Sequence, residues 1–304
     1  MLLPFSVSHE RPKKMKYSYL SKTIFPFLLF SFAVLSAQKI IIINNAGESI
    51  NVKSGKKEIT INGNDKKEFS ETKRISISGS KDLNRFINIF LEPSDQLVIA
   101  VQKNTTIHYS GDQASLHQYI NEQLNIDTFG SINLYENAGN NKKAGELKNI
   151  SELLLVNIMK KANLRNILIT QNDKDSTKRL KNHIKYSWLN TLFPSIGRAD
   201  MDFRKEVINY YFKKYIEPDI EKYSCGNSLQ YNVLEILAKN KDILQAKLPV
   251  YPIVEHTDAD NINQYLPQNC QKQYFRNKYN YLEHINGHSK AYYKKVLKEK
   301  FNDE

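Results

Sequence analysis

The sequence predicts an α+β protein in which a small antiparallel β-sandwich precedes an irregular all-α region. Between Lys39 and about Ser110, short runs that alternate apolar and polar residues are bounded by Gly, Asn, Asp and Ser, as antiparallel strands with tight turns require. From Asp112 onward, apolar residues recur at three- and four-residue spacing, which is the period of a helix. We therefore expect a β domain over residues 38–111 and a helical domain over residues 112–304.

About seven strands are expected in the β domain. The runs that predict them are KIIII, INV, EITIN, RISIS, RFINIFL, QLVIAV and TTIHYS. The stretch EPSD contains Pro93, which lacks an N–H and fixes φ, so the chain should turn there instead of pairing. This number of short strands is typical of a small sandwich or curled sheet.

The helical domain is expected to begin with a helix whose first turn Asp112 caps. Pro194 and Gly197 are stop signals between two later helices. Residues 247–268 contain three prolines and should cross the surface with one short helix. Further helices are expected at about 147–170, 176–192, 201–223, 228–239, 271–284 and 289–301.

Residues 15–37 have the three-part layout of a secretory signal. Lys16 and Lys22 precede an apolar run over residues 24–35, and small residues up to Ala37 follow. The apolar run is about 12 residues, whereas a membrane-spanning helix needs roughly 20, so a cleaved signal is favoured over a retained anchor. We expect cleavage after Ala37 and a periplasmic location, with no membrane span afterwards. Met15 is then a candidate for the true start.

The charge balance is basic. The full chain has 44 Lys and Arg against 32 Asp and Glu, a net charge of +12. Residues 1–37 contain five of the basic groups and one of the acids, so 39 and 31 remain after cleavage, a net charge of +8. Because these charges are scattered along the sequence and form no block, we expect no nucleic-acid partner.

The chain has two cysteines, Cys225 and Cys270, and an exported protein can form disulfides. A bridge between them would close a long loop and contribute about 4 kcal/mol in the chain-entropy model. Two buried free thiols are the alternative, and the sequence leaves both open.

His284 and His288 are the candidate metal ligands, because residues four apart on a helix share a face. In zinc proteases of this spacing a Glu follows the first His, but Ile285 stands there, and Gly287 weakens the helix. We therefore predict no metal site and no cofactor, with two exposed histidines as the favoured interpretation.

Other motifs for catalysis are missing. Glu92 and Asp95 flank a turn and are poorly placed for an acid and base pair. The aromatic and basic runs over residues 209–223, 273–284 and 291–301 could stack bases or pack on sugars, but Tyr and Phe at this spacing more often line the buried stripe of a helix.

Several stretches resemble a known family. FLEPSDQLVIAV followed by IHYSGDQASLHQYI is similar to the segment that joins the N-terminal β domain to the helical region in exported TlpA-like thiol-disulfide reductases, of the type abundant in Bacteroidetes. These proteins carry Gly where Ser94 stands here. HIKYSWLNTLFPSI and NSLQYNVLEILAKNK resemble helices of the same middle region.

The resemblance implies an accessory region without the redox domain. The redox site of that family is a W-C-x-x-C motif in a thioredoxin domain. Trp188 is the only tryptophan here, Leu189 and Asn190 follow it, and no catalytic residue can be carried over. We expect an exported, non-catalytic binding or interaction module, whose partner could be another periplasmic protein.

Two alternatives remain open. One is a redox-active or metal-dependent enzyme whose site uses Cys225, Cys270 or the pair His284 and His288. The other is a ligand-binding protein with a groove between the β and helical parts.

Overall fold

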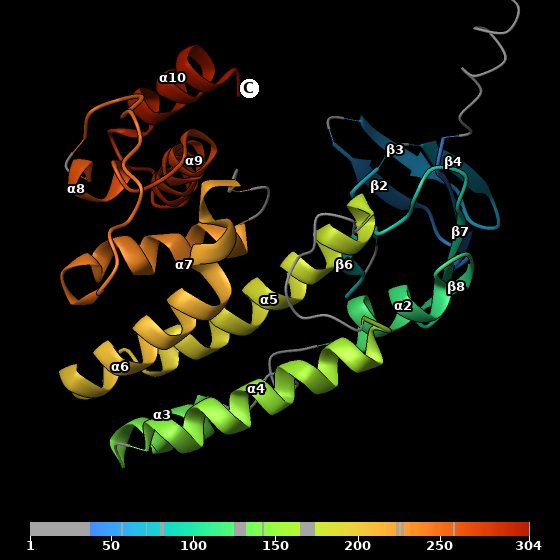
Figure 1. Ribbon diagram of the computed structural model, residues 1–304. Coiled ribbons are helices and arrows are strands. Elements are labelled where there is room, and N and C mark those ends of the chain that lie inside the picture. Colours follow the sequence, from blue (N-terminus) through green and yellow to red (C-terminus); the bar gives the residue numbers. More distant parts are fainter. Residues whose placement is uncertain are drawn as a thin grey trace, which may run out of the picture.

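The computed structural model describes residues 37–303, apart from residues 56, 71, 80, 81, 125–131, 142, 165–173, 223, 224, 226, 227 and 258 (Figure 1). The strands come first and the helices follow, so the predicted α+β class is confirmed. The predicted signal peptide lies outside the described residues, except for Ala37.

The β part consists of two four-stranded sheets within the described residues. Their orders are β4-β1-β7-β8 and β3-β2-β5-β6. Alternate residues of both sheets point into one shared core, including Ile40, Ile77 and Ile99, which are fully buried. The strands are β1 (Lys39–Asn45), β2 (Ile50–Ser54), β3 (Lys57–Ile61), β4 (Lys66–Ser70), β5 (Arg74–Ser78), β6 (Asn84–Asn88), β7 (Gln96–Gln102) and β8 (Ile107–Gly111).

Two features of the sheets differ from the prediction. Strand β4 was not expected, because only Phe69 of its five residues is buried and the run KKEFS gives almost no apolar alternation. Strands β1 and β7 pair in parallel, with Lys39 opposite Gln96, whereas all the pairing was expected to be antiparallel. Alternation fixes which residues face the core, but it does not fix the direction of the neighbouring strand.

The helical part contains α-helices interrupted by π and 3₁₀ turns. They are α2 (Ala114–Gln118), the π-helical η1 (Tyr119–Gln123), α3 (Ile132–Asn140), α4 (Ala144–Lys161), α5 (Asp175–Ser195), α6 (Met201–Tyr211), the π-helical η3 (Phe212–Ile216), the 3₁₀ turns η4 (Glu217–Lys222) and η5 (Lys241–Ile243), α7 (Ser228–Lys239), α8 (Asp260–Asn263), α9 (Gln268–His284) and α10 (Lys290–Phe301).

Most of these helices were predicted, but their ends differ. Asp112 does not cap α2; its Oδ2 accepts a hydrogen bond from the backbone N–H of Gln96 at 2.8 Å, and Gln113 precedes the helix with a left-handed φ of 55°. Helix α3 was not expected. The predicted helix over 147–170 ends at Lys161, and residues 165–173 are not described.

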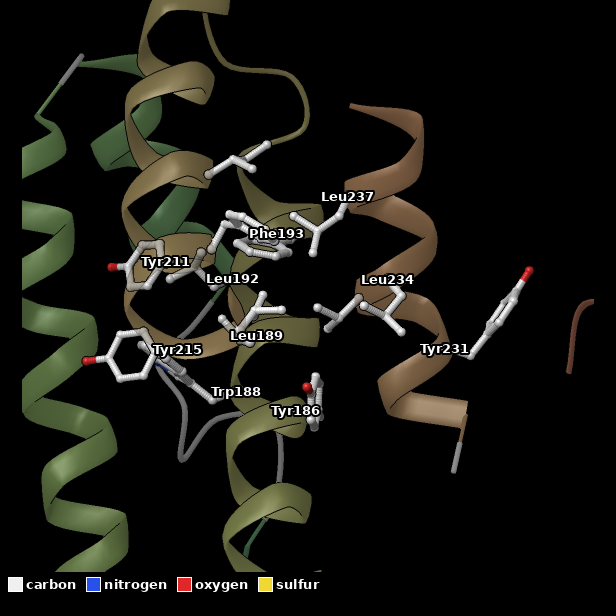
Figure 2. Close-up of a cluster of buried hydrophobic side chains, with 14 of the residues drawn as sticks. Tyr186, Trp188, Leu189, Leu192, Phe193, Tyr211, Tyr215, Tyr231, Leu234 and Leu237 are labelled. Carbon is white, nitrogen blue, oxygen red and sulfur yellow. The ribbon is translucent and has the colours of Figure 1, made fainter. Parts of the chain in front are cut away.

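Helix α5 is the centre of the helical core. Figure 2 shows its apolar side chains between α6 and η3 on one side and α7 on the other. Trp188 meets the rings of Tyr211 and Tyr215 edge-on, with centroids 5.3 and 5.1 Å apart. Leu189 and Leu192 are fully buried between the same helices. The aromatic run over 209–223 thus lines a buried stripe for Tyr211, Phe212 and Tyr215, as expected.

Helices α9 and α10 form an antiparallel hairpin at a distance from the β-sandwich (Figure 1). The ring of Phe275 packs against Phe301, with centroids 5.7 Å apart. Arg276 forms a two-pronged ion pair with Asp303 just after α10. Tyr274 and Phe275 are buried, as expected, whereas Tyr281 and Tyr292 are exposed. Within the described part of the chain, none of the helices is long and apolar enough to cross a membrane.

Candidate functional site

The two cysteines form a disulfide. Cys225 lies between η4 and α7, Cys270 lies in the first turn of α9, and their Cα atoms are 5.0 Å apart. The side chain of Cys270 is fully buried. The bridge therefore ties the segment before α7 to α9, and a buried sulfur is poorly placed to exchange with a protein disulfide.

The two candidate metal ligands are exposed at the α9–α10 turn. His284 is the last residue of α9, and His288 follows the end of that helix. The helix therefore does not stack the two imidazoles on one face. Among the described residues, no group of three or more His, Cys, Asp or Glu side chains is placed to hold a metal ion.

The Glu92 carboxylate links the two parts of the protein. Its Oε1 accepts hydrogen bonds from the backbone N–H and the hydroxyl of Ser176, at 3.0 and 2.5 Å, in the first turn of α5. A carboxylate at a helix N-terminus satisfies a free N–H and interacts favourably with the helix dipole. Asp95 does not face Glu92 across a cleft; its Oδ2 accepts from the Glu92 N–H at 2.9 Å and closes the turn in which Ser94 has a φ of 75°.

Residues 88–92, from the last residue of β6 onward, make further polar contacts with the helices, and we call them the junction segment. The side-chain amide of Asn121 accepts from the N–H of Asn88 at 2.8 Å and donates to its carbonyl at 3.1 Å. Arg179 donates to the carbonyl of Ile89 at 2.8 Å, and its guanidinium lies 5.8 Å from the ring centroid of Phe90. Both backbone groups of Asn88 and the carbonyl of Ile89 are thus satisfied by helical side chains.

His117 of α2 is fully buried beside the junction segment. Its Nε2 accepts from the Phe90 N–H at 3.0 Å, and its Nδ1 lies 2.8 Å from the carbonyl of Gln113. These partners require a neutral ring with the proton on Nδ1. Burial lowers the pKa of His117 below its ordinary value, against the opposing effect of the Gln113 carbonyl.

His183 of α5 also lies against Phe90, with ring centroids 5.8 Å apart. Burial, followed by the positive charge of Arg74, lowers the pKa of His183 to about 4. Both histidines are therefore neutral near pH 7. Both pack against Phe90, and His117 also accepts a hydrogen bond from its backbone N–H.

A second polar cluster joins α4 to α6 and η3. Lys214 donates to both carboxylate oxygens of Glu152 at 2.8 Å, and the hydroxyl of Tyr210 donates to Oε1 at 2.5 Å. Partial burial alone would raise the pKa of Glu152, but the hydrogen bonds from Lys214, Tyr210 and Tyr215 together lower it. The carboxylate is thus fixed in its charged form and occupied by its neighbours.

Among the described residues, two hollows can be named on separate parts of the surface. One has a volume of about 80 Å³ and lies against α3 and α4, where Tyr135 and Glu146 line it. The other is open and lies on the β-sandwich, where Lys57, Glu68 and Arg74 line it. Neither hollow is lined from both the β and the helical part, so neither corresponds to the groove considered from the sequence.

The α9–α10 hairpin concentrates positive charge. Residues 268–301 contain eight Lys and Arg against two Glu, a net charge of +6. Lys272 and Arg276 pair with Asp303, and Lys300 pairs with Glu255. The other five form no ion pair with the described residues: Lys278, Lys290, Lys294, Lys295 and Lys298. The charge is therefore less scattered than the sequence reading suggested.

Exposed apolar side chains accompany this charge. Tyr281 is 60% exposed and Ile285 is 52% exposed, at the end of α9 and the start of the turn. The sequence favoured burial of the aromatic residues of this run, which holds for Tyr274 and Phe275 but not for Tyr281. The signal that could have been noticed is the excess of Lys over Glu after residue 271.

No protein-family model matches this chain, and no curated protein matches it either.

Proposed function

We propose that this chain is an exported, periplasmic binding or interaction module without catalytic activity, equivalent to the accessory region of a TlpA-like thiol-disulfide reductase. Export is inferred from the signal layout of residues 15–37, and the relationship is inferred from the stretches quoted above. The observation that carries the binding function is the α9–α10 hairpin, where exposed Tyr281 and Ile285 lie among lysines that form no ion pair with the described residues. Surface charge of one sign favours partners of the opposite sign.

The geometry of the candidate reactive groups supports a role without catalysis. The Cys270 sulfur is bridged and buried, and the histidines at the junction are held neutral by their packing. The Glu152 carboxylate is engaged by Lys214 and Tyr210. A redox enzyme would need the Cys225–Cys270 bridge to open during turnover.

The absence of reductase activity can be tested with insulin as a disulfide substrate and dithiothreitol as the reductant. We expect the purified protein to reduce insulin no faster than dithiothreitol alone, and the Cys225→Ser variant to behave identically. A clear rate that the Cys225→Ser substitution abolishes would refute the proposal.

The binding surface can be tested by placing a photo-crosslinking amino acid at Tyr281 in the exporting cell. Leu153 on α4 is the matched control, because it is 61% exposed and lies outside the hairpin. We expect a crosslinked product from position 281 that position 153 does not give. Equal or absent products at both positions would contradict a binding role for the hairpin.

A further inference from the structure

One face of α9 is covered in its first half and open in its second half. Tyr274 is buried on this face, and Lys278, Tyr281 and Ile285 follow it at intervals of four, three and four residues, which keeps them on the same side of the helix. Lys278 is exposed, as are the two apolar side chains beyond it. The apolar stripe of α9 therefore extends past the part of the molecule that packs against it.

The outward face of α10 is basic. Val296 and Leu297 are buried, whereas Lys294, Lys295 and Lys298 are exposed. The two acids of the hairpin do not form ion pairs with these lysines: the Glu283 carboxylate accepts from Tyr279, and Glu299 is exposed on α10. Positive charge is thus left without an acidic partner among the described residues of the hairpin.

The chemistry of the hairpin surface indicates the class of partner. The hairpin presents exposed Tyr281 and Ile285 together with lysines that form no ion pair with the described residues. Tyr and Ile side chains insert at the boundary between lipid headgroups and acyl chains, while lysines extend their ammonium groups to anionic headgroups. Apolar side chains beside lysines are the composition of segments that bind at the membrane interface.

We propose that the α9–α10 hairpin docks on the surface of an anionic lipid bilayer through Tyr281, Ile285 and the lysines that have no acidic partner among the described residues. The inference rests on the proposed binding function and names its partner. Tyr281 and Ile285 enter the interfacial layer, and Lys278, Lys294 and Lys298 contact the headgroups. Binding depends on both anionic lipid and salt, because exposed charges are screened within about 8 Å at physiological ionic strength.

The test is co-sedimentation of the protein, purified from the exporting cell, with vesicles of phosphatidylcholine that contain about 30% phosphatidylglycerol, in about 0.15 M salt. We expect binding to these vesicles and little binding to pure phosphatidylcholine. The Lys294→Glu/Lys298→Glu variant should bind more than about tenfold more weakly, since each lysine near an anionic surface contributes about fivefold. Ile285→Ser should weaken binding about fivefold or more through the lost apolar insertion.

Lys66→Glu/Lys67→Glu provides the matched control, because both lysines are exposed on β4 and the change in net charge is the same. This variant should retain binding within about twofold. Absence of binding by the unaltered protein, or equal losses in the two charge variants, would overturn the bilayer proposal.

The crosslinking experiment at Tyr281 separates the two proposals. A protein product without a lipid product would leave the binding function standing and exclude the bilayer as its partner. A lipid product together with loss of vesicle binding in Lys294→Glu/Lys298→Glu would support both.

Discussion

The backbone N–H of Phe90 donates a hydrogen bond to Nε2 of His117 at 3.0 Å, and this bond joins the end of the β-sandwich to the first helix. The side chain of Phe90 belongs to the core of the helical part, although its sequence neighbours Ile89 and Leu91 belong to the other core. The protein thus has two hydrophobic cores, and the junction segment crosses between them. Its buried backbone groups depend on helical side chains for their partners.

Replacement of His117 by Phe should destabilise the protein by about 1–3 kcal/mol, because the buried N–H of Phe90 loses its acceptor. The change can be measured as a lower midpoint of urea unfolding at pH 7.5. His108→Phe is the control, since His108 is exposed on β8 and a surface substitution should change the stability by less than about 0.5 kcal/mol. Similar stability of the two variants would show that the bond to His117 contributes nothing.

Mildly acidic pH should lower the free energy of unfolding, because the unfolded chain protonates His183 more readily than the folded protein does. Its pKa is about 4 in the folded protein and higher in the unfolded chain, so the unfolded chain binds more protons between about pH 4 and 6.5. The free energy of unfolding is therefore greatest above pH 6.5 and decreases as the pH falls toward 4. Burial lowers the pKa of His117 as well, which acts in the same direction. Because the His183 ring is only partly buried, we expect a loss of about 1–3 kcal/mol.

This pH dependence can be measured by urea unfolding between pH 4.5 and 7.5, a window above the usual pKa of most carboxylates. His183→Gln should flatten the curve, because the substituted side chain does not titrate. The interpretation fails if the variant and the unaltered protein show the same slope.

Reduction of the Cys225–Cys270 bridge should destabilise the protein by up to about 4 kcal/mol, because the closed loop spans a sequence separation of 45 residues. Thermal unfolding with and without a reductant would measure the change. The Cys225→Ser and Cys270→Ser variants both lose the bridge, but the second should be less stable because Cys270 is fully buried and a hydroxyl there needs a partner. Unchanged stability on complete reduction would contradict the expected contribution.

The fold class could be predicted because its signal is local. Alternation in KIIII and QLVIAV places Ile40, Ile42 and Ile99 in the sandwich core, where they are fully buried. Helical spacing in α5 places Trp188 in the second core in the same way. Strand β4 was not predicted, because its packing depends on one apolar residue. The parallel direction of β1 and β7 was not predicted either, because it depends on how the whole sandwich closes.

The contacts at the junction and in the polar cluster could not be predicted, because they join residues far apart in the sequence. Glu92 and Ser176 are separated by 84 residues, and Glu152 and Lys214 by 62. Nothing local marks either carboxylate as a partner of a distant helix. The net charge of the hairpin, by contrast, can be counted from residues 268–301 of the sequence. Which of its lysines form ion pairs with acidic side chains can be known only from the folded chain.

Weakening the junction should separate the unfolding of the two cores. In Glu92→Ala/Arg179→Ala, the start of α5 loses the Glu92 carboxylate, and the carbonyl of Ile89 loses its donor. Because each core is formed largely within its own part of the chain, we expect one cooperative transition in the unaltered protein and two in the variant. Differential scanning calorimetry would resolve them.

Lys39→Ala/Glu68→Ala is the control, since it removes an exposed ion pair between β1 and β4 within one sheet and should leave a single transition. Two transitions in the unaltered protein would mean that the junction does not couple the cores, whereas a single transition in the variant would mean that Phe90 and the two histidines suffice to couple them.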